Sequence, residues 1–261
     1  MVQPLWVFQA VKRLVSAILI ALALWAQSAS AAPALVRSAK SGACSTSCTA
    51  TFSVATTAGN TIIGVVSEFY SFSNFGFSNT ITDDGSNTYG TAYTHDNGAA
   101  GPSIKVSYID NAASATVVTS TSSTGSQFDF VVMEVSGLAT STSLDQAGGY
   151  HQDVATTAYT ANSITTTQAD EFVLGVHLLN STGTINATPS GLFTTVITNT
   201  SNNPTLQTQY YVASSTGSYT SAGAWDISGI TDSAMVSFKG AGGGGATSHP
   251  CASLRLLGVG C

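Results

Sequence analysis

A period-two alternation of apolar and polar residues recurs many times between Thr49 and Lys239, and it constrains the fold more than any other feature. The runs are short, rich in Val, Ile, Thr, Tyr and Phe, and bounded by Gly, Asn, Asp and Ser, as β-strands are. No window of helical length shows an apolar stripe with helix caps. The pattern predicts an all-β fold, namely an antiparallel, jelly-roll-like β-sandwich of about a dozen strands.

We expect one sandwich domain over residues 49–240. The alternative is two smaller sandwiches divided near Ser141, although no internal sequence repeat and no Pro-rich or charged linker indicates such a division. Trp225 is expected to anchor the core. Further side chains on the apolar faces of the strands are expected in the core: Ile62, Val65, Phe130, Val132, Val135, Phe172, Leu174, Val176, Val236 and Phe238.

Charged residues make up only 8% of the chain, whereas an average soluble domain has about 25%. Seven Lys and Arg stand against thirteen Asp and Glu, for a formal net charge of −6. This composition excludes a helical bundle rich in Glu, Lys and Ala. Nucleic acid is excluded as a partner because binding to phosphates requires clustered Lys and Arg. With few Lys to guard edge strands, the edges are covered by loops or pair with another chain, which leaves a homo-oligomer open.

Residues 1–31 have the pattern of a secretory signal peptide. A basic pair, Lys12 and Arg13, precedes an apolar run over residues 14–26, and an Ala-Ser-Ala sequence ending at Ala31 supplies the cleavage pattern. The run is shorter than the roughly 20 residues that a spanning helix needs. We therefore expect a secreted protein, extracellular or at the cell surface, without a membrane span once the signal is removed.

An exported chain meets oxidising conditions, so the cysteines are expected to form disulfides. They lie near the two ends: Cys44, Cys48, Cys251 and Cys261. Three pairings are open, one local (Cys44–Cys48 with Cys251–Cys261) and two that tie the ends together. The alternative is a zinc site formed by Cys44, Cys48, His249 and Cys251. Residues 32–48 are expected to be an N-terminal extension, and residues 241–261 a Gly-rich linker with a Cys-containing tail.

Four segments occur in a characteristic order: GNTIIGVVS (59–67), ITDDGSNTY (81–89), FDFVVMEVSGL (128–138) and DEFVLGV (170–176). They resemble a group of poorly characterised β-sandwich domains in exported bacterial and phage-associated proteins. Those domains carry similar G-[ND]-T-I, [IV]-T-D-x-x-G/S-N-T-Y and E-x-S-G-L markers. The resemblance covers Thr49 to Lys239 and implies a jelly-roll or immunoglobulin-like sandwich. It transfers no catalytic residues.

The sequence offers no catalytic motif. Jelly-roll glycosidases need two carboxylates that face one groove about 5–9 Å apart, and Glu68, Glu134 and Glu171 form no such pair on one strand. Glu134 is expected to be a structural carboxylate that accepts hydrogen bonds. No G-x-S-x-G nucleophile elbow occurs. The histidines are isolated from one another in the sequence: His95, His151, His177 and His249.

Asp83, Asp84 and Asn87 place oxygen atoms on one tight turn. We expect a hairpin turn in which Asp84-Gly85 supplies a positive φ and the flanking side chains bond the backbone. The alternative is a structural calcium site, because calcium prefers carboxylate and amide oxygens, although the spacing is not that of an EF-hand. No other cofactor is expected.

Aromatic residues are concentrated in the segment 69–77, where they alternate with Ser, Asn and Gly. Exposed rings among small polar residues are typical of surfaces that stack on sugars or contact proteins. We expect a ligand-binding surface formed by Tyr70, Phe72, Phe75 and Phe77. The alternative is a loop that caps an open end of the core.

Together these features predict an exported, non-catalytic binding or structural surface module. Glycans, or a cell or particle surface, are its expected partners. The alternatives are an extracellular carbohydrate-active enzyme whose carboxylates come from separate strands, and a self-assembling surface or virion subunit.

Overall fold

The computed structural model describes residues 31–69, 79–97, 102–122, 127–181, 187–200 and 203–242. Within these ranges the chain forms sixteen strands and no helix, hence none that could cross a membrane, and every strand pair is antiparallel. This confirms the predicted all-β fold. Several predictions lie outside the described residues: the signal peptide up to Ser30, the aromatic residues Tyr70, Phe72, Phe75 and Phe77, the tail cysteines Cys251 and Cys261, and His249.

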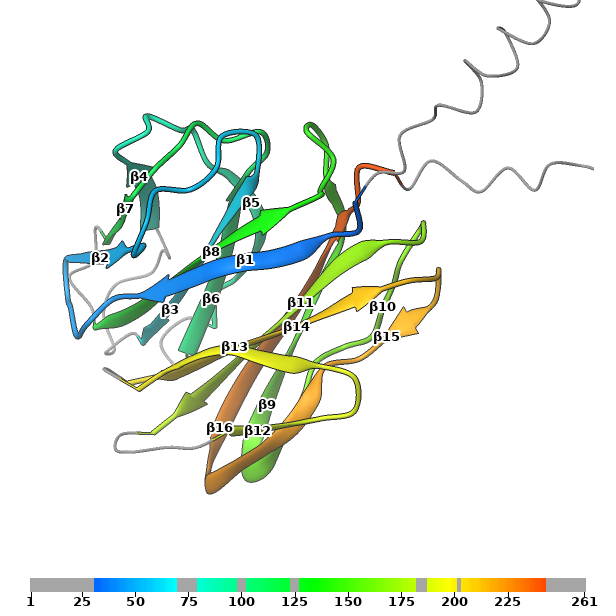
Figure 1. Ribbon diagram of the computed structural model, residues 1–261. Coiled ribbons are helices and arrows are strands. Elements are labelled where there is room, and N and C mark those ends of the chain that lie inside the picture. Colours follow the sequence, from blue (N-terminus) through cyan, green and yellow to red (C-terminus); the bar gives the residue numbers. More distant parts are fainter. Residues whose placement is uncertain are drawn as a thin grey trace, which may run out of the picture. The chain divides into compact units, whose positions relative to one another are not determined.

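The first eight strands form one jelly roll. They are β1 (Ala34–Lys40), β2 (Ser47–Thr51), β3 (Thr61–Phe69), β4 (Asn79–Asp83), β5 (Gly90–His95), β6 (Pro102–Ile109), β7 (Val117–Ser122) and β8 (Phe128–Ser136). The pairs β1·β8, β2·β7 and β3·β6 nest inside one another, as when one long hairpin folds over on itself. The result is an inner sheet of order β1-β8-β3-β6-β5 and an outer sheet of order β2-β7-β4 (Figure 1).

Six of the last eight strands repeat this arrangement, and the other two form a separate two-stranded sheet. The eight are β9 (Leu144–Thr160), β10 (Ile164–Thr165), β11 (Glu171–Asn180), β12 (Ala187–Ser190), β13 (Thr194–Asn199), β14 (Thr205–Ala213), β15 (Ser218–Tyr219) and β16 (Ala222–Lys239). The inner sheet has the order β9-β16-β11-β14-β13, which is the first order with each number raised by eight. The C-terminal end of β9 pairs with the N-terminal end of β16, and that end of β16 also pairs with β12. These three segments take the places of β2, β7 and β4 in the first roll.

The strand register identifies equivalent residues in the two rolls. Gly64 on β3 and Gly175 on β11 hold the same place in the middle strand of each inner sheet. A Cβ atom at either glycine would collide with a side chain packed above it, so both allow a close approach of the outer layer. A register shift follows Thr91 on β5 and recurs after Thr195 on β13. The strands that the structure describes between Ala34 and Lys239 therefore form two structurally equivalent halves.

The main core lies between the two inner sheets and joins the rolls into one unit. β5 contacts β9, and β13 contacts β1 in the same way, so the interface has the pattern of a two-fold axis. A second core lies between the first inner sheet and β2, β4 and β7. All the predicted core residues are buried, together with Trp225: Ile62, Val65, Phe130, Val132, Val135, Phe172, Leu174, Val176, Val236 and Phe238.

The sandwich begins earlier than the sequence predicts. Residues 34–40 form β1, which pairs with β8, and Cys48 lies on β2, so most of the expected N-terminal extension belongs to the first roll. β1 is an edge strand that is only half-buried, and its sequence therefore carries little apolar alternation. The two rolls meet between Ser136 and Leu144, close to the division near Ser141.

Candidate binding cleft

A cleft of about 310 Å³ opens at one edge of the first roll, between β4 of the outer sheet and β5 and β6 of the inner sheet. Among the described strands, β4 pairs only with β7 and β5 only with β6, so no β4·β5 pair closes the roll. The facing edges of β4 and β5 therefore carry backbone N–H and C=O groups that no described strand pairs. The volume lies at the lower end of the roughly 300–1,000 Å³ that small-molecule sites have.

Four threonines are among the residues that line the cleft. The exposed threonines are Thr80, Thr82, Thr88 and Thr91. Their hydroxyls make no hydrogen bond with any other residue that the structure describes. A hydroxyl group both donates and accepts hydrogen bonds. This wall therefore suits a ligand that itself carries several hydroxyls.

Asn79 lies at the start of β4 and also lines the cleft. Its side chain is 1% exposed, and neither Oδ1 nor Nδ2 has a hydrogen-bond partner among the described residues. Leaving a buried amide without partners costs about 1–3 kcal/mol.

Lys105 supplies the positive charge of the cleft. Its Nζ donates a hydrogen bond to the backbone carbonyl oxygen of Asn79, 2.5 Å away. Burial lowers the pKa of Lys105. No described Asp or Glu side chain forms an ion pair with this ammonium group. Two of its three N–H donors are thus left for a ligand.

The turn at residues 83–87 adjoins the cleft, and protein donors occupy its oxygen atoms. Asp83 accepts hydrogen bonds from the backbone and side-chain amides of Asn87 and from the hydroxyl of Tyr89. Asp84 accepts from two consecutive backbone N–H groups next to β7, and these bonds lower the pKa of Asp84. Within the described ranges, no group of three or more His, Cys, Asp or Glu side chains could hold a metal ion. The calcium alternative gains no support from this geometry.

The same turn is not a hairpin, contrary to the prediction. β4 and β5 belong to different sheets, so the chain crosses here from the outer to the inner layer. Ser86, and not Asp84 or Gly85, has the positive φ, of 59°. Gly85 is needed for a close approach instead, because a Cβ atom there would lie 2.6 Å from the backbone oxygen of Ser114.

Glu134 on β8 is a structural carboxylate. Its Oε2 lies 2.7 Å from Nε of Arg37 on β1. Its Oε1 accepts hydrogen bonds from the backbone of Thr57 and the side chain of Asn60. Arg37 also donates to two backbone carbonyls of the same loop, at residues 54 and 55. The ion pair therefore fastens the loop between β2 and β3.

The three glutamates do not share a groove. Glu68 pairs in register with Phe128, and Glu134 with Ile62, so six residues of strand separate the two glutamates, or about 20 Å. Glu171 belongs to the other inner sheet. It is fully buried, which raises its pKa, and it shares the N–H of Thr167 as a donor with Asp145. These carboxylates do not form the open pair that a glycosidase requires.

Two of the predicted histidines come together at the interface of the rolls. Nδ1 of His95 on β5 lies 2.9 Å from Oδ2 of Asp232 on β16. The rings of His95 and His151 are 6.2 Å apart. The hydrogen bond to Asp232 raises the pKa of His95. The sequence did not predict this cluster because its residues are far apart in the chain and come from different rolls.

His177 is fully buried in the second roll. Its ring nitrogens lie 2.8 Å from the hydroxyl of Ser233 and 2.7 Å from that of Ser221. The ring also packs on Tyr159, with centroids 4.3 Å apart. Burial lowers the pKa of His177 to about 3, so the imidazole is neutral at ordinary pH. Because no solvent reaches it, His177 is a structural residue.

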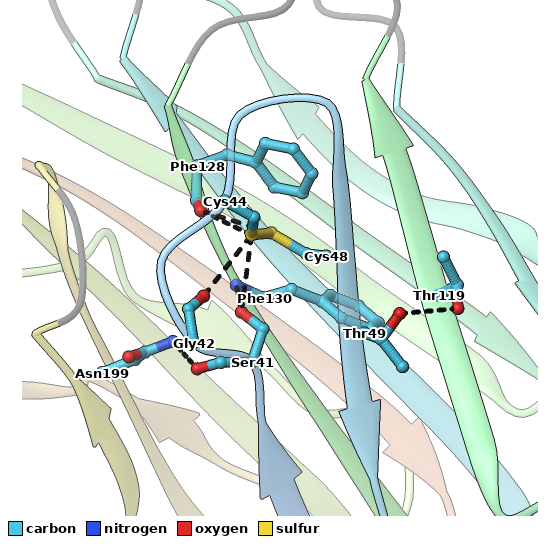
Figure 2. The surroundings of a disulfide bond; sticks show 9 residues. All are labelled: Ser41, Gly42, Cys44, Cys48, Thr49, Thr119, Phe128, Phe130 and Asn199. Carbon is cyan, nitrogen blue, oxygen red and sulfur yellow. Dashed lines mark hydrogen bonds between the residues drawn. A yellow bond between two sulfur atoms is a disulfide. The ribbon is translucent and has the colours of Figure 1, made fainter.

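A disulfide joins Cys44, in the loop after β1, to Cys48 on β2, as the local pairing predicts (Figure 2). Both sulfur atoms lie 3.4 Å from the carbonyl oxygen of Phe128. Asn199 of the second roll donates a hydrogen bond to the carbonyl oxygen of Ser41, so this loop also contacts the other half. Cys44 and Cys48 are therefore not available as zinc ligands.

Sequence reasoning missed the two residues that give the cleft its character. Lys105 and Asn79 lie on strands that the alternation predicts. The alternation does not show which strand edges stay unpaired, so it does not show which polar side chains line a cleft between them. One signal was present: Lys105 is a single positive charge in a chain with very few. The predicted aromatic surface (Tyr70, Phe72, Phe75 and Phe77) comes shortly before Asn79 in the chain and lies outside the described residues.

No family model matches the chain, and comparisons with curated proteins and with solved structures found no significant match. The resemblance to exported bacterial and phage-associated sandwich domains accordingly stays a prediction.

Proposed function

We propose that the protein is an exported, non-catalytic module that binds a glycan in the cleft between β4 and β5. The observation that carries this proposal is a cleft lined by four exposed threonines whose hydroxyls have no partners within the described residues. Sugars carry several hydroxyl groups, and each hydroxyl can both donate and accept hydrogen bonds.

Three further features support the proposal. Jelly rolls serve as scaffolds for lectin domains, which is an argument by analogy of fold. The dispersed glutamates favour binding over hydrolysis, since they form no open pair. The Cys44–Cys48 disulfide and the signal-peptide pattern are both typical of an exported protein.

The proposal is tested by probing a glycan array with the secreted full chain and with a Thr82→Val/Thr88→Val variant. Valine matches threonine in shape but lacks the hydroxyl, so the fold should persist while glycan binding weakens about tenfold or more. Thr51→Val is the matched control, because Thr51 is an exposed strand threonine outside the cleft. Absence of any glycan bound by the wild type, or equal binding by all three proteins, would overturn the proposal.

A further inference from the structure

Lys105 and Gln207 occupy equivalent positions in the two rolls. Lys105 pairs in register with Val66, two residues beyond Gly64, and Gln207 pairs with His177, two residues beyond Gly175. Each side chain reaches the first carbonyl of the neighbouring outer strand: Lys105 donates to Asn79, and Gln207 donates to Ala187 at 3.5 Å. A neutral amide is thus sufficient for the structural contact, and the charge of Lys105 serves no purpose that the fold requires.

The other cations that the structure describes are accounted for. Arg37 pairs with Glu134, and Lys239 lies 3.4 Å from Asp145. Lys40 is exposed to solvent and donates to the backbone carbonyl of Thr198. Lys105 alone among them combines partial burial with the absence of a carboxylate partner in the described part of the chain. Its lowered pKa has burial as the sole cause, which agrees with the absence of a nearby anion.

The cleft therefore joins a half-buried cation to a wall that suits hydroxyl groups. The remaining N–H donors of Lys105 match a carboxylate, since a charge-assisted hydrogen bond is about twice as strong as a neutral one. A neutral sugar would leave the ammonium group without a counter-charge.

We propose that the cleft selects sugars that carry a carboxylate, that is, uronic acids, with the acid group bound by Lys105. This inference rests on the proposed glycan-binding function and names its ligand class. The free chain repels anions overall because of its net charge of −6, so recognition depends on this one cation at short range.

The experiment uses an array of oligouronates of several linkages, each printed beside its methyl ester, together with neutral oligosaccharides. The two members of each pair share their rings and hydroxyls and differ only at the carboxyl group, which is ionised in one and methylated in the other. The secreted full chain is compared with Lys105→Gln, which places at position 105 the residue that the second roll uses at 207. Lys40→Gln is the control, since it removes the same charge from another strand of the first roll whose lysine also donates to a carbonyl.

We expect at least one uronate to bind roughly ten- to a hundred-fold more tightly than its ester. That preference should disappear in Lys105→Gln, with an unchanged thermal midpoint, and persist in Lys40→Gln. If the wild type binds esters and neutral glycans as well as uronates, or if Lys105→Gln keeps the preference, this inference is overturned while glycan binding stands. If no glycan of any kind binds, the inference and the proposed function both fail.

Discussion

His95 of the first roll and Asp232 of the second form a hydrogen-bonded ion pair across the interface, with Nδ1 2.9 Å from Oδ2. Asp232 is fully buried on β16, and the side chain of His95 is 31% exposed. In the equivalent place on β13, Asn199 reaches back to the carbonyl of Ser41 in the first roll. The last residue of each of these two strands thus fastens its roll to the other, but only the His95 contact depends on pH.

The His95–Asp232 contact should make stability decrease as pH rises through neutrality. The pKa of His95 is raised in the folded protein above its unfolded value of roughly 6.5. The contact stabilises the fold fully at a pH below the unfolded pKa, and this stabilisation is lost as the pH rises through the raised pKa of the folded state. The loss in unfolding free energy should be on the order of 1 kcal/mol. The test is urea unfolding between pH 6 and about 8.5 for the wild type and for His95→Asn, which copies Asn199. Parallel curves for the two proteins would contradict the assignment.

His177 should have the opposite effect. The unfolded imidazole takes up a proton below roughly pH 6.5, whereas the buried one stays neutral down to a pKa of about 3. Stability should therefore fall as pH decreases through this window, by up to about 1.4 kcal/mol per pH unit. The ring resonances of His177 in the wild type should not titrate between pH 7 and pH 5. In His177→Gln the acid-side slope of the unfolding free energy should be smaller, and a titrating resonance would show that the ring is accessible.

Removing Glu134 should be costly although no reaction depends on it. Glu134→Ala leaves the guanidinium of Arg37 and the N–H of Thr57 without their acceptor, at a cost of about 3 kcal/mol. Because a pair of apolar residues can replace a buried ion pair, the double variant Arg37→Met/Glu134→Met should be less destabilised than the two single changes add up to. Denaturant midpoints measure the cycle. A Glu134→Ala midpoint equal to that of the wild type would show that the loop is held by other contacts.

The strands and core could be predicted from the alternation because packing is set by side-chain period. The alternation did not show that there are two cores. Val65 and Val135 lie in the main core, whereas the second core, between the first inner sheet and the outer sheet, contains Ile62, Phe130 and Val132. A run such as the one from Phe130 to Met133 has no polar positions because the inner sheet is covered on both faces. In the sequence, this run was the one feature that indicated a layer on the second face of the inner sheet, which a two-sheet sandwich does not have.

The duplication could not be predicted because it resides in the backbone pairing and not in shared residues. Gly64 and Gly175 are equivalent, but Val66 corresponds to His177 and Lys105 to Gln207, so side-chain chemistry differs where the outer layers differ. The cleft escaped prediction for a related reason. It depends on a strand pair that does not form, and a strand-forming sequence looks the same whether or not its edge is paired.

The Cys44–Cys48 disulfide should contribute modest stability, because it closes a short loop. Loop-closure entropy gives about 2 kcal/mol for a loop of this length. The variant Cys44→Ala/Cys48→Ala should therefore have a free energy of unfolding that is lower by about 2 kcal/mol, and it should unfold at a lower urea concentration. The same variant also tests the tail cysteines. With Cys44 and Cys48 joined, the predicted partner of Cys251 is Cys261, so thiol labelling of the denatured, unreduced variant should find no free thiol. Labelling of two thiols would show that the tail cysteines are reduced or had paired with the N-terminal ones.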